Sequence, residues 1–529
     1  MIAIILFAVF PKINELSLTA PFSLLIPNLT DPRLSGAIAN SLMLSASVTA
    51  VAALTALPLS LLRARMSKRQ GQFWDVCFLI PFLIPPYIGS LAWMQLLQRN
   101  GFIEQLFGFH AGAMLYSFTG ITLVMALNLF PLIYFSASRS LMVIGSRYGD
   151  IARVCGANPL STFFRIDLPL VLPALVSSGL IVFILTIEEF GTPEILGRRF
   201  GFEVMVTAVH DKFTNWPVDL AGASVLCCVL ILLAFLAYRG QQMIVAVYQT
   251  QVDANGFATA EPSTSVLLRL LTVGVFALVA IIAVALPLAS VTASAFMDTM
   301  SGGLDRDNFS LRNMQTVFAP GSDAINAILT SLSLAIAAAL LTALIGFLVA
   351  FTLVRLPSRG TAMLDFLSIL PNSIPGMAVA VGLILTWNLP FWPVTPYNTL
   401  LILLLAYLCL MLPYPIRMLT TALRQLPTSL DHAAYVAGAN EITVVRRILA
   451  PLLAPVAFAA GFIVFAISTR ELVTSLMLSP PGVETVATFV FRQFDQGSMN
   501  VGMAMSLLTI LLSAVVIGAG QRLAGRTFR

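Results

Sequence analysis

Of the 529 residues of this chain, 58% are hydrophobic and only 10% are charged, and the formal net charge is +5. Soluble domains carry roughly 25% charged residues, so the composition predicts a protein whose main solvent is lipid. No lysine follows a glycine in the sequence. This excludes a phosphate-binding P-loop, which needs a Gly-Lys pair, so any ATP that the protein uses must bind to another subunit.

Taken in chain order, the apolar stretches predict about six helices in each half, most of them near the roughly 20 residues that a helix needs to cross a bilayer. In the first half the predicted helices are 1–13, 37–62, 74–97, 117–138, 169–187 and 218–238. In the second half they are 265–293, 325–354, 363–388, 398–416, 451–469 and 499–519. The predicted fold class is all-α, a polytopic membrane protein of about 12 transmembrane helices in two parallel six-helix repeats.

The first predicted helix is unusually short. Its apolar part is followed at once by Pro11 and Lys12, and about ten residues of helix reach only about 15 Å. No basic segment precedes it, so it does not resemble a signal peptide. We expect either that residues upstream of Met1 complete this helix or that the helix is a remnant.

The two halves repeat one another at constant spacing, which in an apolar chain indicates duplication when the matched residues are Pro, Gly, Asn and Asp. An offset of 290 relates Ser41 to Ser331, Arg65 to Arg355, Asp75 to Asp365, Pro81 to Pro371 and Pro85 to Pro375. An offset of 282 relates Gly156–Asn158 to Gly438–Asn440, Pro169 to Pro451, Pro173 to Pro455 and Glu189 to Glu471. The second half therefore lacks eight residues, which we place in the loop after its third helix. The predicted domains are 1–248, a polar cytoplasmic linker at 249–264, and 265–529.

Basic residues predict the orientation in the membrane. Most of the 29 Lys and Arg residues fall in the loops after even-numbered helices, and such loops are cytoplasmic by the positive-inside rule. An even number of helices per half gives both halves the same orientation, related by an axis along the membrane normal. The positive net charge is thus a topology signal, which leaves lipid as the expected surrounding and gives no support to a nucleic-acid partner.

The cytoplasmic loops after the fourth helix of each half share a pattern that predicts two short helices joined by a tight turn. A glycine ends the first helix, because it adopts positive φ cheaply, and an asparagine caps the second. We expect small alanines at the tip, so that the loop fits a groove in a partner. The candidate residues are Asp150, Ala152, Gly156, Ala157 and Asn158 in the first loop, and Ala433, Ala434, Gly438, Ala439 and Asn440 in the second.

This spacing resembles the signature of binding-protein-dependent ABC importer permeases, in which Glu-Ala-Ala is followed by Gly, Ile and Leu-Pro at fixed distances. The first copy has Asp150 for the Glu and Ile151 for the first Ala, and the second has His432 for the acid and Ala450 for the Leu. The resemblance implies the type I importer permease fold in a bacterial inner membrane. It also implies two copies of a cytoplasmic ATP-binding subunit that hold ATP and Mg, and a periplasmic solute-binding protein. This chain would then be no enzyme and would need no cofactor of its own.

The segments Glu189–Pro193 and Glu471–Ser475 follow the fifth helix of each half. They resemble the fused ferric-iron permeases, with weaker similarity to thiamine, phosphonate and polyamine permeases. Ferric iron prefers oxygen ligands, and charges at membrane depth are functional by default. The candidate translocation residues are Glu188, Glu189, Arg470 and Glu471.

Two alternatives stay open for these charges and for the chain. Arg470 could form an internal ion pair with Glu188 or Glu189, in which case the charges are structural. A secondary transporter of the major facilitator type would also have twelve helices, but the loop 63–71 lacks its signature. The cysteines and histidines are not spaced like zinc ligands, so no metal-binding or catalytic residue is assigned.

Overall fold

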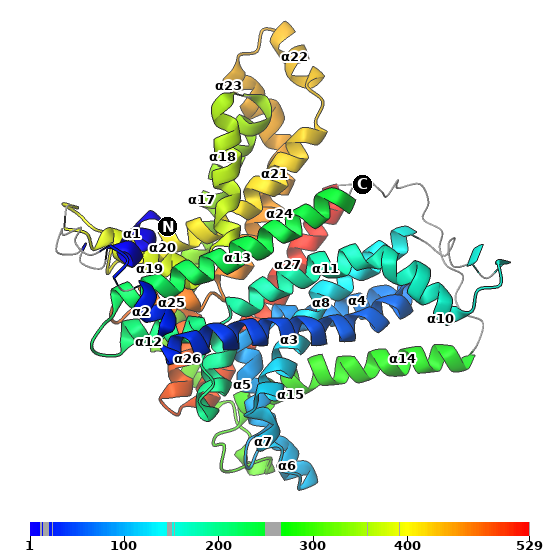
Figure 1. The fold of residues 1–529 in the computed structure, drawn as a ribbon, viewed down its shortest axis with the longest axis vertical. Coiled ribbons are helices and arrows are strands. Elements are labelled where there is room, and N and C mark those ends of the chain that lie inside the picture. Colours follow the sequence, from blue (N-terminus) through cyan, green and yellow to red (C-terminus); the bar gives the residue numbers. More distant parts are fainter. Residues whose placement is uncertain are drawn as a thin grey trace. The chain divides into compact units, whose positions relative to one another are not determined.

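A computed structural model describes residues 1–10, 13, 21–23, 25–144, 151–152, 154–248, 266–356, 358–390 and 392–527. Within these ranges the chain is helical and has no strand, apart from one isolated bridge between Met297 and Phe309 (Figure 1). Among the described helices, eight are long and apolar enough to cross a membrane, and ten if each of two bent pairs counts as one span. The polytopic all-α fold class is therefore confirmed.

The chain forms two compact units. One consists of Ala8–Pro11 and Ala20–Ser310, and the other of Met1–Phe7, Lys12–Thr19 and Leu311–Arg529. In the first of these, the helices are α2 (Leu25–Thr30), α3 (Pro32–Arg63), α4 (Lys68–Leu83), α5 (Pro86–Leu97), α6 (Phe102–Phe107), α7 (Gly112–Leu115), α8 (Phe118–Ile144), α10 (Pro159–Thr162), η2 (Phe163–Asp167), α11 (Leu168–Ile187), η3 (Pro193–Gly197), η4 (Arg198–Phe200), α12 (Met205–Thr214), α13 (Leu220–Tyr248), α14 (Val266–Ala280), η6 (Ile281–Ala285), α15 (Leu286–Phe296) and η7 (Arg306–Asn308).

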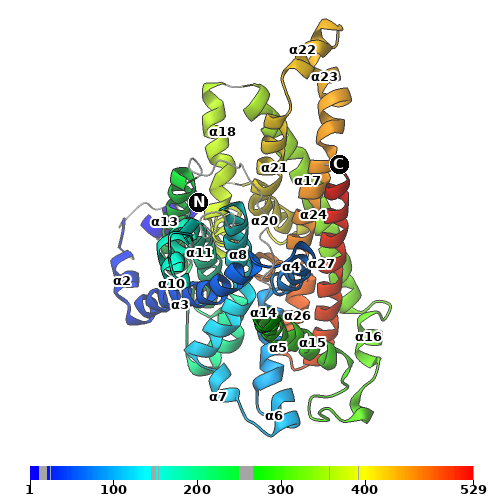
Figure 2. The same ribbon diagram turned by 90° about the vertical axis from the view of Figure 1, so that its right-hand side faces the viewer.

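The other unit contains α1 (Ile2–Val9) up to Phe7, α16 (Arg312–Val317), α17 (Asp323–Arg355), α18 (Arg359–Ile369), η8 (Leu370–Ser373), α19 (Gly376–Trp387), α20 (Leu400–Met411), α21 (Pro413–Gln425), α22 (Ser429–Val436), α23 (Glu441–Val444), η9 (Val445–Leu449), α24 (Ala450–Ser468), α25 (Val473–Leu478), α26 (Val486–Asp495) and α27 (Met499–Thr527). In this unit α17, α24 and α27 run side by side (Figure 2).

The first helix of each sequence half belongs to the unit formed by the rest of the other half. Ile4 on α1 lies 3.2 Å from where a Cβ on Gly382 of α19 would stand. On α14, Phe276 stacks on Phe78 of α4 with ring centroids 5.3 Å apart. The compact units therefore differ from the sequence halves 1–248 and 265–529, because the first helix of each half is part of the other unit.

Two predicted helices, 74–97 and 363–388, are interrupted, which corrects the expectation of continuous spans. Ile84 is extended (φ −75°, ψ 120°) and separates α4 from α5, and the two segments meet at 94°. A proline lacks the N–H that a helix needs and disfavours a helical residue before it, and Pro85 and Pro375 stand at the two breaks. At the first break, the Asn128 amide donates to the carbonyl oxygens of Pro81 (2.8 Å) and Ile84 (3.3 Å). This side chain replaces backbone partners that lipid cannot supply.

The remaining two of the twelve predicted helices do not reach a full span. The helix α1 has 8 residues, and the interrupted pair α18 and α19 has 11 and 12. The predicted helix 398–416 is also bent, by 42°, where Pro413 begins α21.

The repeat marked by the sequence has a structural counterpart in two serines. Ser41 on α3 accepts a hydrogen bond from the backbone N–H of Met205, at the start of α12, at 2.8 Å. Ser331 on α17 accepts one from the N–H of Val486, at the start of α26, also at 2.8 Å. The matched serines thus cap matched helices. The eight missing residues also lie where predicted, because the connection after α5 runs over 98–117 and the one after α19 over 388–399.

Candidate functional site

Two loops, which we call loop A (residues 150–158) and loop B (residues 432–440), contain the turns predicted after the fourth helix of each half. Gly156 and Gly438 both have φ +82°, a conformation that favours glycine over every other residue. In loop A the N–H of Ala157 donates to the carbonyl of Ala152 at 2.9 Å, and in loop B the N–H of Ala439 donates to that of Ala434 at 3.0 Å. Such bonds close a helix at its C-terminus. Asp150 lies outside the described residues.

The asparagine after each turn starts the next helix. The Asn158 side chain accepts from the N–H of Ser161 at 2.7 Å, and the Asn440 side chain accepts from the N–H of Thr443 at 2.9 Å. Both are N-caps, as predicted. Figure 1 shows α22, the helix that leads into loop B, projecting beyond the end of α21.

Large apolar side chains are exposed in each loop and just after it. Val154 and Val436 are equivalent positions and are 89% and 90% exposed. Leu160 and Ile442, beyond the turn, are also equivalent and are 70% and 75% exposed. The sequence pattern did not reveal this pair. A usable signal would have been the presence, in both halves, of one apolar residue before the glycine turn and one after its asparagine cap.

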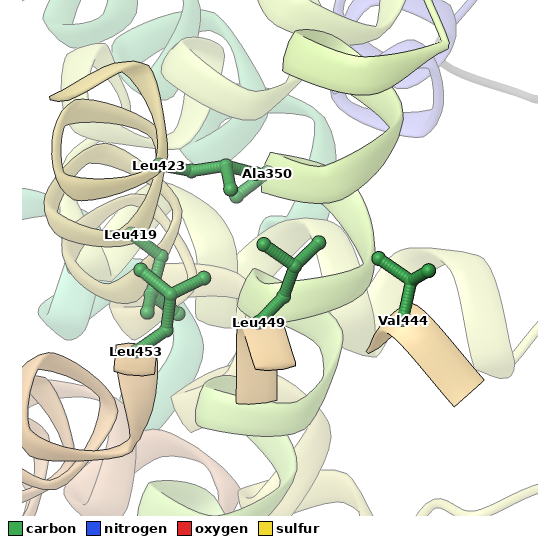
Figure 3. Packing of buried hydrophobic residues seen from close by; sticks show 6 residues of the cluster. All are labelled: Ala350, Leu419, Leu423, Val444, Leu449 and Leu453. Carbon is green, nitrogen blue, oxygen red and sulfur yellow. The ribbon is translucent and has the colours of Figure 1, made fainter. Parts of the chain in front are cut away.

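Most of the alanines face the protein, which corrects the expectation that small alanines form the tip. Ala434 and Ala439 pack against a buried cluster, whose six residues are shown in Figure 3, and Ala152 is buried. Ala157 is half-buried, whereas Ala433 and Ala437 are exposed. The cause is the buried cluster beneath loop B, formed by Ala350, Leu419, Leu423, Val444, Leu449 and Leu453.

An ion pair anchors loop B to the end of α17. The Arg355 Nε lies 2.6 Å from Asp431 Oδ2, and both side chains are only 10% exposed. Arg355 Nη2 also donates to the carbonyl of Leu426 at 3.2 Å. Removing one partner of a buried pair leaves an uncompensated charge, which is strongly destabilising. The position equivalent to Asp431 in the first half is Gly149, which has no carboxylate.

The acidic residues after the fifth helix have matched surroundings in the two halves. Glu189 Oε1 accepts from the N–H of Thr192 at 3.2 Å, and Glu471 Oε1 accepts from the N–H of Thr474 at 3.0 Å. Each carboxylate therefore caps the short helical turn that follows it.

Each of these turns packs beside the start of an interrupted helix within its own unit. A Cβ on Gly191 would lie 2.5 Å from Cβ of Tyr87 on α5. A Cβ on Gly376, the first residue of α19, would lie 3.9 Å from Oε1 of Glu471. A helix N-terminus favours negative charge, so these starts suit carboxylates. The predicted continuous helices could not have indicated this neighbourhood.

The other two candidates lie next to these carboxylates in the chain. Glu188 directly follows α11 in the unit that contains residues 20–310, and Arg470 precedes Glu471 in the other unit. Their ion pair therefore stays a prediction. Within the described residues, no three His, Cys, Asp or Glu side chains gather in a group that could hold a metal ion.

Comparison with known proteins matches two segments, 56–247 and 342–529, to the family described as binding-protein-dependent transport system inner membrane component. The chain is 27% identical to the ferric transport system permease protein FbpB of Actinobacillus pleuropneumoniae, over 91% of this chain and 70% of that protein. It is 23% identical to the Fe(3+)-transport system permease protein FbpB 2 of Haemophilus influenzae, over 96% and 92%. The molybdenum transport system permease ModB of Mycobacterium tuberculosis is 26% identical, but over only 40% of this chain.

Proposed function

The chain belongs to the family of inner-membrane components of binding-protein-dependent transport systems, and we propose that it is the permease of an ATP-driven importer of ferric iron. Membership implies an ATP-binding subunit and a periplasmic binding protein as partners. The permease is a transport protein and not an enzyme.

The observation that carries the assignment of partners is the pair of loops. Loops A and B share a glycine at φ +82°, an Asn cap and an exposed apolar pair. Two equal surfaces fit two copies of one subunit, so we assign one ATP-binding subunit to each loop. We assign both loops to the cytoplasm, because the basic residues are concentrated in the loops after even-numbered helices.

Ferric iron is favoured as the cargo because the relatives that are similar over almost the whole chain are ferric permeases. Relatives that transport molybdenum or 2-aminoethylphosphonate match less than half of the chain. The carboxylates of Glu189 and Glu471 are hard oxygen donors, which suit a hard cation in transit. The backbone N–H groups that they accept from keep both side chains in place.

The test uses the chain reconstituted in liposomes with its ATP-binding subunit. ATP hydrolysis is measured with the periplasmic binding protein of the system, either empty, loaded with ferric iron, or incubated with 2-aminoethylphosphonate. We expect the chain alone to hydrolyse no ATP and the ferric form to stimulate the complex above the empty form. Stimulation by the phosphonate and not by iron would contradict ferric iron as the cargo. Hydrolysis by the chain alone would contradict the assignment of ATP hydrolysis to a separate subunit.

A further inference from the structure

In each unit, three charged residues connect a short helix to the start of a long one. Clamp A consists of Arg33 at the start of α3, Glu203 just before α12, and Asp211 on α12. Arg33 Nε lies 2.8 Å from Glu203 Oε2, and Arg33 Nη2 lies 3.3 Å from Asp211 Oδ2. One arginine therefore bridges two carboxylates.

Clamp B occupies the equivalent place in the other unit and consists of Asp323, Glu484 and Arg492. Arg492 Nε lies 2.7 Å from Glu484 Oε1, and Arg492 Nη2 lies 3.2 Å from Asp323 Oδ2. Again one arginine bridges two carboxylates, but here it stands on the short helix, α26.

The repeat offsets show that the two clamps are the same device with two charges exchanged. Asp323 is the position of Arg33 at the offset of 290. At an offset of 281, Glu484 is equivalent to Glu203 and Arg492 is equivalent to Asp211. The acid common to both is kept, while the arginine and the aspartate have changed places. The serine caps next to the clamps, Ser41 and Ser331, are unchanged, so the exchange is confined to the charges.

The exchange makes the short helices non-interchangeable. If α12 lay on α17, Asp211 would face Asp323, with Glu203 beside both carboxylates. If α26 lay on α3, Arg492 would face Arg33. Like charges this close disfavour either arrangement, and juxtaposed charges of this kind are a recognised means of rejecting a wrong partner.

This fold has a reason to need such a device. The first helix of each half already leaves its own half for the other unit, so homologous elements of the two halves compete for similar surfaces. The serine caps cannot discriminate between the halves, because they are identical. We propose that the exchanged charges of clamps A and B are specificity determinants that keep α12 on α3 and α26 on α17.

The surroundings of Glu484 support this assignment of roles. Burial raises the pKa of the Glu484 carboxyl, Asp323 raises it further, and Arg492 opposes the rise. Arg492 is thus the group that allows two neighbouring carboxylates to coexist. Clamp A has an additional arginine, Arg198, 2.5 Å from Asp211, whereas the equivalent position in the other half is Ser479. Clamp B is therefore the cleaner place for a test.

Three variants of the full chain reproduce the wrong and right pairings in clamp B. Arg492→Asp gives α26 the negative charge that Asp211 has on α12, so that this charge faces α17. Asp323→Arg gives α17 the positive charge that Arg33 has on α3, so that this charge faces α26. The double variant recreates the arrangement of clamp A. The measurements are the unfolding temperature of the purified protein and the hydrogen exchange of the Val486 amide, which bonds Ser331. Asp495→Arg, at the exposed end of the same helix, is the control for a charge change alone.

We expect each single variant to lower the unfolding temperature by about 2–4 °C and to speed exchange of the Val486 amide, with Arg492→Asp the worse of the two because it gathers three acids. The double variant should return both measurements to those of the parent, and Asp495→Arg should leave them unchanged. A double variant as defective as the worse single variant would overturn the proposal. Single variants indistinguishable from the parent would overturn it too.

Discussion

At the scale of single residues, the exposed valines of loops A and B are the most informative side chains. A side chain that is about nine-tenths exposed contributes little to the fold of the chain. Burying a valine in a partner stabilises the complex by about 1.5–3 kcal/mol. Val154 and Val436 can therefore be changed without harm to the permease, which makes binding separable from folding.

We expect Val154→Ser and Val436→Ser each to weaken binding of the ATP-binding subunit about fivefold, which corresponds to roughly 1 kcal/mol. Co-purification and titration of the subunit against the detergent-solubilised permease measure the loss. Val394→Ser is the matched control, because Val394 is 81% exposed and belongs to the connection after α19 and to neither loop. Unchanged affinity in both loop variants would exclude the apolar pair from the interface.

Gly438 acts through its backbone and not through its small size. A Cβ added there would have no neighbour within 4 Å, but φ is +82°. Alanine at this φ is strained by about 1 kcal/mol, whereas asparagine tolerates the conformation better. We expect Gly438→Ala to lower the unfolding temperature and membrane abundance, and Gly438→Asn to lower them less. Equal stability of the parent and the alanine variant would show that the turn does not depend on the glycine.

The turns themselves could be predicted from the sequence. The glycine permits the backbone bond that closes the first helix, and the asparagine two residues later caps the second helix, so both bonds depend only on nearby residues. The exposure of the alanines could not. Whether Ala434 faces a partner or its own protein depends on the cluster around Leu419 and Leu453, which come from other helices.

At the scale of elements, the interrupted helices are the main departure from the sequence prediction. The hydrophobic stretch is continuous through both breaks, so hydropathy alone predicts one span. Pro85 and Pro375 were visible as marks of the repeat, but a proline can also be accommodated within a membrane helix, as Pro131 is within α8. At the first break, the deciding information is the amide of Asn128, which comes from α8.

We expect Asn128→Leu to destabilise the protein by about 1–3 kcal/mol, because it leaves two backbone carbonyls in an apolar environment without their donor. The unfolding temperature measures the effect. Leucine occupies the equivalent position, Leu410, in the second half, so the substitution is compatible with the fold. A variant as stable as the parent would show that the break at Ile84 does not rely on this side chain.

At the scale of the whole molecule, the duplication and the family are readable from sequence because prolines, glycines and aspartates keep their spacing. The exchange of first helices is not, since nothing local in residues 1–10 or 266–296 specifies which half they join. The charge exchange between the clamps is likewise invisible until contacts pair Arg33 with Asp211 and Asp323 with Arg492. Local structure could therefore be predicted from the sequence, whereas contacts between residues far apart in the chain could not.

Transport of iron by the whole assembly tests the proposed function most directly. Liposomes that contain this chain and its ATP-binding subunit, with ATP inside, are given the binding protein loaded with radioactive ferric iron outside. We predict accumulation of iron in the lumen that requires internal ATP and falls when Val154 and Val436 are both changed to serine. Accumulation without ATP would contradict an ATP-driven importer, and ATP-dependent uptake of another solute with no uptake of iron would contradict the assigned cargo.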